Sequence, residues 1–146
     1  MRDAHYLKER KNMIQFYFLS IVFNAAAGYC LITAGEEGTM EPSLRSSLQN
    51  ETFHLILGIL ATVTGLLKLL SAVQGDVPVL GDLLPALVGF ATGFILLFDY
   101  YRSRTTIVSA LSERLEGLLS KNKKWIGFLS LAVAGLHFLF PTVLFL

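Results

Sequence analysis

Hydrophobic residues along this chain are grouped in four long runs that short polar segments separate. The runs cover residues 13–34, 52–73, 83–100 and 125–146. A helix needs about 20 predominantly apolar residues to cross the hydrocarbon core of a bilayer, and each run is close to that length. The pattern therefore predicts four transmembrane helices and leaves few residues for any other structure.

The segments between the first three runs carry turn and helix signals. Pro42 opens the stretch 42–50, which predicts a short helix at the membrane surface. Two glycines and a proline in residues 75–81 predict a hairpin turn, since both residue types interrupt helices. Asp82 is expected to cap the third transmembrane helix, with Pro85 in its first turn, where a proline costs no hydrogen bond.

Residues 101–124 form the longest connection and show a different pattern. Apolar residues recur there at helical spacing with charged residues between them, which predicts an amphipathic helix over about 104–120. Such a helix lies along the membrane surface or against a partner. The predicted fold is an all-α integral membrane protein, a four-transmembrane-helix bundle with this interfacial helix between the third and fourth spans, in a single domain over 1–146.

The composition supports this fold and excludes several classes of function. The chain is 53% hydrophobic and only 16% charged, against about 25% charged in a typical soluble domain. A net charge of +1 gives no case for nucleic acid as a partner. Cys30 is the single cysteine, so disulfides within the chain, CxxC redox pairs and cysteine zinc sites are excluded. No cofactor or metal is predicted.

The basic residues do not fix the orientation of the chain in the membrane. With four spans, the 12 lysines and arginines divide almost evenly between the two sides. The positive-inside rule then gives no firm answer. The largest basic cluster lies in residues 101–124, which favours a cytoplasmic position for that loop.

Two strongly polar side chains, Asn24 and His137, fall near the predicted midplane of the bilayer. Their depths are similar enough for them to meet across the helices, with the hydroxyl groups of Thr62, Thr64 and Thr92 available nearby. Polar side chains at this depth are costly and mark either function or helix association. Two interpretations are open: a relay for protons or substrate, or an interhelical hydrogen bond that stabilises the bundle.

The remaining polar candidates are predicted to lie near the membrane surfaces. On one side are Lys68, Asp76 and Asp82, which either extend to the interface and cap helices or form a coupled lysine–aspartate site. On the other side are His54, Asp99, Tyr100, Tyr101, Arg102 and Arg104. Asp99 is expected to pair with Arg102 or Arg104 on adjacent helical turns.

A weak internal repeat relates the two halves of the chain. Residues 59–73 align without gaps on residues 129–143, and residues 23–32 loosely match residues 88–97. A duplicated helical hairpin would explain both matches. Apolar membrane sequence of low complexity also produces such matches by chance.

Three functions fit this sequence, with the lipid bilayer as the environment in each. The leading hypothesis is a non-enzymatic accessory or assembly subunit of a larger membrane protein, acting through helix packing. The alternative is a small homo-oligomeric transporter or channel for an ion or small solute, using Asn24 and His137. The third is a membrane enzyme for a lipophilic substrate, with an interfacial site that includes His54 and Asp99.

Overall fold

The computed structural model of the protein describes residues 2–34, 41–73, 79–106 and 109–140. Side chains are described for residues 17–34, 41–43, 46–70, 83–106 and 109–140. The helices are α1 (Arg2–Thr33), α2 (Pro42–Leu48), α3 (Glu51–Val73), α4 (Val79–Arg104) and α5 (Ala110–Leu139). Since this part of the chain contains helices and no strands, the all-α prediction is confirmed.

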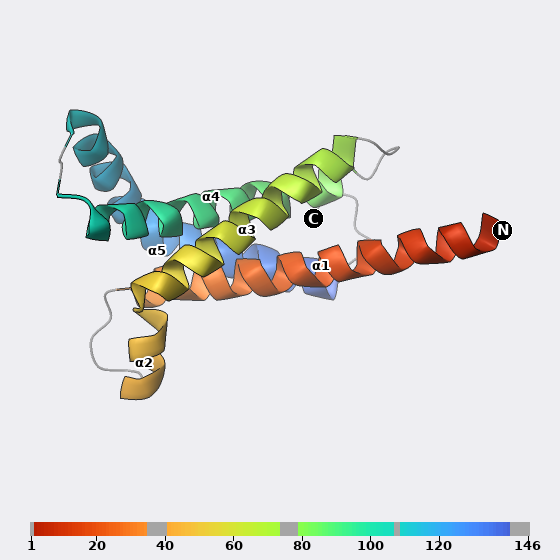
Figure 1. Cartoon of the computed structure of the whole chain (residues 1–146), viewed down its shortest axis with the longest axis horizontal. Coiled ribbons are helices and arrows are strands. Elements are labelled where there is room, and N and C mark those ends of the chain that lie inside the picture. The colour runs from red at the N-terminus through yellow and green to blue at the C-terminus, as the bar shows by residue number, and fades with distance from the viewer. Residues whose placement is uncertain (1, 35–40, 74–78, 107–108, 141–146) are drawn as a thin grey trace.

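The four long helices run side by side and alternate in direction along the chain (Figure 1). The closest packing joins α3 to α4 and α1 to α5, with further contacts between α1 and α4, α1 and α3, and α4 and α5. The short helix α2 contacts α3. The first turns of α1 extend beyond the other helices, and the first turns of α5 project from the opposite end (Figure 1).

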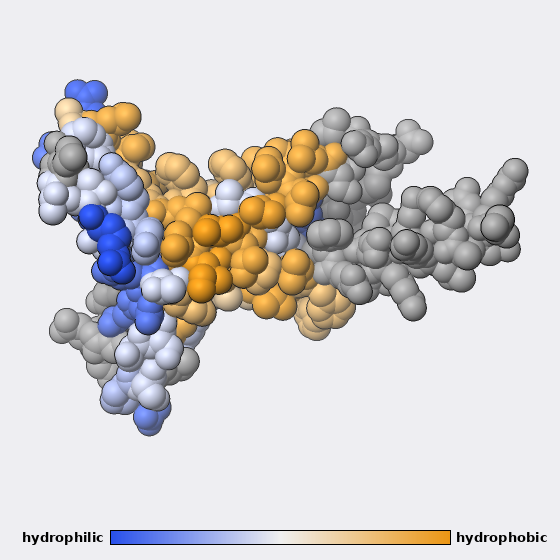
Figure 2. Space-filling view, in the orientation of Figure 1, coloured by the Kyte–Doolittle hydropathy of each residue, from blue (hydrophilic) through white to orange (hydrophobic). Residues whose placement is uncertain are grey.

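Two of these helices are long and apolar enough to cross a membrane. The segments are Glu51–Leu70 of α3 and Leu83–Arg104 of α4. The described apolar segment of α1, Tyr17–Thr33, is shorter. A hydrophobic band covers the middle of the molecule, and hydrophilic residues gather at the end that carries α2 and the start of α5 (Figure 2). These features point to membrane association.

Two helices begin before the apolar runs that they contain. Helix α1 is continuous from Arg2, so the charged residues before position 13 extend the first helix. Helix α4 begins at Val79, directly after Pro78 in the sequence, so Asp82 is inside the helix and does not cap it. Pro85 consequently lies beyond the first turn. Gly81 does not prevent this, because one glycine costs a helix only about 1 kcal/mol.

The prediction of a separate interfacial helix is wrong, because α5 is one helix from Ala110 to Leu139. It starts later than position 104, at a capping box in which the Ser109 hydroxyl accepts from the Ser112 backbone N–H at 3.1 Å. Residues 121–124, three of which are lysines, do not interrupt it, since lysine is a good helix former and neither glycine nor proline occurs there. The predicted end of the last span, residues 141–146, lies outside the described residues.

Glycines let the backbones of paired helices approach closely. A Cβ atom on Gly28 of α1 would lie 2.7 Å from the Gly127 carbonyl oxygen of α5. A Cβ atom on Gly93 of α4 would lie 2.8 Å from the Gly58 carbonyl oxygen of α3. Both distances are shorter than real Cβ contacts. Small residues of this kind are typical where membrane helices pack, because they bring backbones into van der Waals contact.

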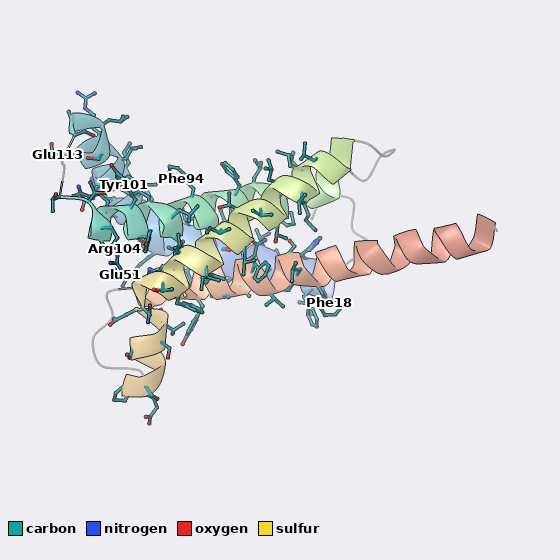
Figure 3. All side chains as sticks on the ribbon, in the orientation of Figure 1. Phe18, Glu51, Phe94, Tyr101, Arg104 and Glu113 are labelled. Carbon is teal, nitrogen blue, oxygen red and sulfur yellow. The ribbon has the colours of Figure 1, made fainter. Side chains whose placement is uncertain are left out.

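The interior is narrow and the outer faces are apolar. The hydrophobic core consists of Ala27, Cys30, Leu31, Leu57, Ala61, Ile95 and Leu96. Large apolar side chains also point outwards, as Phe18 and Phe94 do, with 53% and 44% of their surface exposed (Figure 3). This distribution fits helices that present an apolar surface to lipid or to a partner.

We expect Gly28→Ala and Gly93→Ala each to destabilise the fold by about 1–3 kcal/mol, as overpacking a tight contact does. Gly117→Ala and Gly135→Ala are the matched controls, because a Cβ atom there meets nothing within 4 Å. Thermal unfolding in detergent measures the difference. Equal stability of Gly28→Ala and Gly135→Ala would show that this contact is loose.

Candidate functional site

A lysine and a histidine meet inside the protein where α3 and α5 approach their ends. The Lys68 Nζ atom lies 2.9 Å from the His137 Nε2 atom. The two residues are only 5% and 2% exposed. His137 lies near the end of α5, which extends to Leu139. Lys68 is buried and does not extend to an exposed interface as predicted.

Tyr17 of α1 completes this group, which we call the Lys–His cluster (Tyr17, Lys68 and His137). The tyrosine ring lies 4.6 Å from the imidazole ring between centroids. Its hydroxyl donates a hydrogen bond to the His137 carbonyl oxygen. The Lys68 ammonium nitrogen lies 5.6 Å from the centroid of the Tyr17 ring, within the range of a cation–π contact. Three helices therefore supply the cluster.

The lysine–histidine contact limits the protonation states that the pair can adopt. A hydrogen bond between two nitrogen atoms needs one N–H donor and one lone pair. Lys68 donates as an ammonium group to a neutral imidazole, a protonated His137 donates to a neutral amine, or a neutral amine and a neutral imidazole share the bond. If Lys68 and His137 were both charged, two like charges would meet in a medium of low dielectric, which is strongly unfavourable. The contact is therefore compatible with one added proton on the pair but not with two.

Asn24 occupies a different place in the interior. Its Nδ2 atom donates to the Pro85 backbone carbonyl oxygen at 3.0 Å. The Ser130 hydroxyl donates to the backbone carbonyl oxygen of Asn24 at 2.7 Å. Asn24 therefore links α1 to α4 and α5. It lies about 10 Å along α1 from Tyr17, at 1.5 Å per residue, so the structure places Asn24 and His137 in separate polar groups.

Gly89 of α4 provides the space that the Asn24 side chain occupies. A Cβ atom at position 89 would lie 2.7 Å from the Asn24 Oδ1 atom. The buried amide thus fills a gap in the surface of α4, and this fit fixes the register of α1 against α4.

The three candidate threonines do not join the Lys–His cluster through any contact that the structure gives. Thr92 is buried, and its hydroxyl donates to the Val88 carbonyl oxygen of its own helix at 2.9 Å. Thr62 packs against Gly93 at the α3–α4 contact, and its hydroxyl oxygen has no hydrogen-bond partner among the described residues. Thr64 is buried in α3.

The opposite end of the molecule carries charged residues joined between helices (Figure 3). The ion pairs that the structure describes there are Asp99–Lys123, Arg102–Glu116 and Arg104–Glu51. The Asp99 Oδ2 and Lys123 Nζ atoms are 2.5 Å apart, so Asp99 pairs with α5 instead of with an arginine on its own helix. The reason is geometric, because the neighbouring helix presents its charges directly to this side chain.

A small pocket of about 120 Å³ opens among these charges between α4 and α5. Its polar lining consists of Asp99, Arg102, Glu116, Ser120 and Lys123. The two acidic and two basic side chains balance, so the pocket has no net charge with which to attract an ion.

The other residues predicted near this interface make separate local contacts. The His54 Nε2 atom lies 2.7 Å from the Leu48 carbonyl oxygen and links α3 to α2. The Arg104 guanidinium lies 5.7 Å from the centroid of the Tyr100 ring, and Tyr101 is 51% exposed. These contacts fix the end of the helices and do not converge on one reacting centre.

The aspartates predicted beside Lys68 cannot be compared with the structure. Asp76 and the side chain of Asp82 lie outside the described part of the chain. Sequence reasoning identified Lys68 and His137 separately but did not join them, and it did not select Tyr17. The alternating direction of the helices was the available signal, since it brings the end of α3 and the end of α5 to the same side.

A protein-family model matches residues 13–137 of this chain. The chain is also 34% identical, over 136 residues, to an uncharacterized protein of Treponema pallidum (strain Nichols), covering 92% of this chain and 100% of that protein. The chain belongs to this family. No solved structure matches it. The matched region contains Tyr17, Asn24, Lys68 and His137, so both polar groups lie within the family's shared segment.

We expect Gly89→Ala to cost about 1–3 kcal/mol in the wild-type protein, because the new methyl group displaces the Asn24 amide. In an Asn24→Ala background the same change should cost much less, since the displaced group is absent. A double-mutant cycle on thermal unfolding in detergent measures this coupling. Gly135→Ala is the control and should cost the same in both backgrounds. Additive costs for Gly89→Ala and Asn24→Ala would contradict the fit.

Proposed function

We propose that the protein is a four-span membrane protein that binds and releases a proton at the Lys68–His137 pair, as part of the transport of protons or of a small ion coupled to them. The membrane-spanning architecture is inferred from α3 and α4. Only 33% of the membrane-length segment of α3 and 44% of that of α4 is buried within the protein, whereas the core helix of a soluble protein is mostly buried. Helix α1 packs against both α3 and α4, and α5 packs against α4 and α1.

The single observation that carries the function is the buried contact of two basic side chains. Charged groups inside a membrane are expensive and are found where ions or protons move. Histidine titrates near neutral pH, and an amine 2.9 Å away supplies a second base for the same proton. Such a pair accepts and returns a proton by exchanging donor and acceptor roles, without a change of fold.

The geometry also limits the size of what is bound. Lys68 and His137 are in direct contact, and the ring of Tyr17 covers the imidazole at 4.6 Å. No solute fits between these groups in the described conformation. A proton fits without any movement, so we take the proton as the primary ligand.

Proton flux into liposomes tests this function. Purified protein is reconstituted around a pH-sensitive dye, and a membrane potential is imposed. We expect wild type to acidify the lumen and both Lys68→Met and His137→Gln to lower the rate by about tenfold or more, as loss of a proton-transfer group does.

Two exposed or peripheral residues provide matched controls for this measurement. Lys121→Met and His54→Gln remove the same side-chain types at the opposite end of the molecule, and both should keep the wild-type rate. Absence of flux in wild type, or equal flux in all four variants, would rule the function out. Circular dichroism in the same detergent shows that each variant retains its helices.

A second function, as an accessory subunit of a larger membrane protein, is favoured by the start of α5. Leu111 and Leu118 are 68% and 64% exposed near the start of α5, whose first turns project from the other helices (Figure 1). Large apolar side chains on a projecting amphipathic segment are typical of surfaces that bind a partner or the membrane surface.

If this second function holds, native mass spectrometry of protein extracted from its own membrane should show a heterologous subunit at fixed ratio. The double variant Leu111→Glu/Leu118→Glu should lose that subunit, because two buried charges would oppose the contact. Arg114→Gln changes an exposed polar residue on the same turns and should retain it. Isolation of wild type without any subunit would exclude the accessory role.

A further inference from the structure

The two halves of the chain repeat the same pattern of burial. Residues 18–32 of α1 can be matched with residues 83–97 of α4 without a gap. Every residue buried in α1 over this stretch then has a buried counterpart, and no exposed residue is matched with a buried one. The buried pairs are Ser20 and Pro85, Asn24 and Gly89, Ala27 and Thr92, Gly28 and Gly93, Cys30 and Ile95, and Leu31 and Leu96.

Helices α3 and α5 also share a burial pattern when residues 56–68 are matched with residues 125–137. The pairs buried in both helices are Gly58 and Gly127, Ala61 and Ser130, Thr64 and Val133, Gly65 and Ala134, and Lys68 and His137. Every exposed residue in one stretch matches an exposed residue in the other. Lys68 and His137 therefore occupy the same position in two equivalent helices.

The burial pattern of α3 and α5 differs by one residue from the sequence alignment of residues 59–73 with residues 129–143. The sequence alignment pairs Gly65 with Gly135. A Cβ atom on Gly65 would lie 2.8 Å from the Ala86 carbonyl oxygen, whereas a Cβ atom on Gly135 meets nothing within 4 Å. The two glycines are thus not equivalent, and Ala134 is the counterpart of Gly65.

The contacts between helices repeat in the same register. Gly28 meets Gly127 across α1 and α5, and their counterparts Gly93 and Gly58 meet across α4 and α3. Helices α1 and α4 run in one direction, and α3 and α5 run in the other (Figure 1). A two-fold pseudosymmetry axis parallel to the helices therefore relates the first hairpin to the second.

Residues that touch their own counterparts lie on this axis. Asn24 and Gly89 do so, with 2.7 Å between the Asn24 Oδ1 atom and a Cβ atom at position 89. Lys68 and His137 do so at 2.9 Å. Two independent pairs on different helices thus place the axis through the middle of the protein.

We infer that the protein consists of two copies of one helical hairpin, and that Lys68 and His137 are the same position in the two copies, meeting on the axis to form a single shared site. That the shared ligand is a proton rests on the proposed function, whereas the equivalence of the positions does not. Binding sites at the interface between structural repeats are common in small membrane transporters. Here the equivalent positions carry two different bases, so one proton is shared between unlike partners.

Exchange of the two residues tests the equivalence. In K68H/H137K each base takes the place of the other, so an approximately two-fold site should accept the change. We expect this variant to regain the thermal stability that H137K alone loses and, if the site carries protons, the flux that H137K lowers by about tenfold. H137K and K68H are the matched single variants.

The side chains next to Lys68 and His137 differ between the two halves, so a second variant exchanges a neighbouring position as well. Extending the register by one residue matches position 17 with position 82, which are tyrosine and aspartate in the sequence. The fourfold exchange Y17D/K68H/D82Y/H137K therefore moves the neighbouring position together with the base. Recovery of stability in either exchanged variant supports the inference. If both are no more stable than the sum of their single changes predicts, the equivalence is wrong.

The two proposals fail in different ways. If wild type carries no protons but an exchanged variant recovers the stability that H137K loses, the proposed function is wrong and the equivalence stands. If wild type carries protons and neither exchanged variant recovers stability or flux, the equivalence is wrong and the proposed function stands.

Discussion

The close approach of backbones at glycine is the constraint on which the rest of this structure depends. Gly28 faces Gly127, and Gly58 faces Gly93, at distances that admit no side chain. In the bilayer that the proposed function places around these helices, there is little hydrophobic gain between them, so packing of this kind and hydrogen bonds supply the association energy. Once the two glycine contacts set the spacing and register of each helix pair, the buried polar side chains have fixed positions. Asn24, Lys68 and Ser130 then find partners on a neighbouring helix.

The polar interior follows from that register. The Asn24 amide fits because Gly89 leaves its space open and the Pro85 carbonyl accepts its hydrogen bond. The buried Lys68 amine contacts His137 and Tyr17. Removing one partner of such a contact leaves the other desolvated, which costs more than the contact itself contributes. The polar groups therefore both depend on the helix register and stabilise it.

The sequence predicts properties of a single segment, such as the length of a helix. It does not predict burial and register, which depend on contacts with other helices. The run 52–73 matches α3 (Glu51–Val73) closely, because length and apolar composition are properties of the segment itself. The sequence misplaces the starts of α4 and α5. The glycine at position 81 and the lysine-rich residues 121–124 look like helix breaks in the sequence, but neither is strong enough to interrupt a continuous helix. Lys68 near the end of a helix suggests an exposed ammonium group, and only the positions of α1 and α5 reveal that it is buried. The repeat was misaligned for the same reason, because two glycines look alike in sequence whether or not a backbone lies against them.

A symmetric scaffold with an asymmetric centre has a chemical consequence. Two lysines at equivalent axial positions would share a proton between groups of equal basicity, and two histidines would do the same. A lysine facing a histidine makes the two protonated states unequal, because their ordinary pKa values are about 10.4 and 6.5. Tyr17 contacts both bases. The scaffold thus supplies the meeting point, while the departure from symmetry determines which side holds the proton.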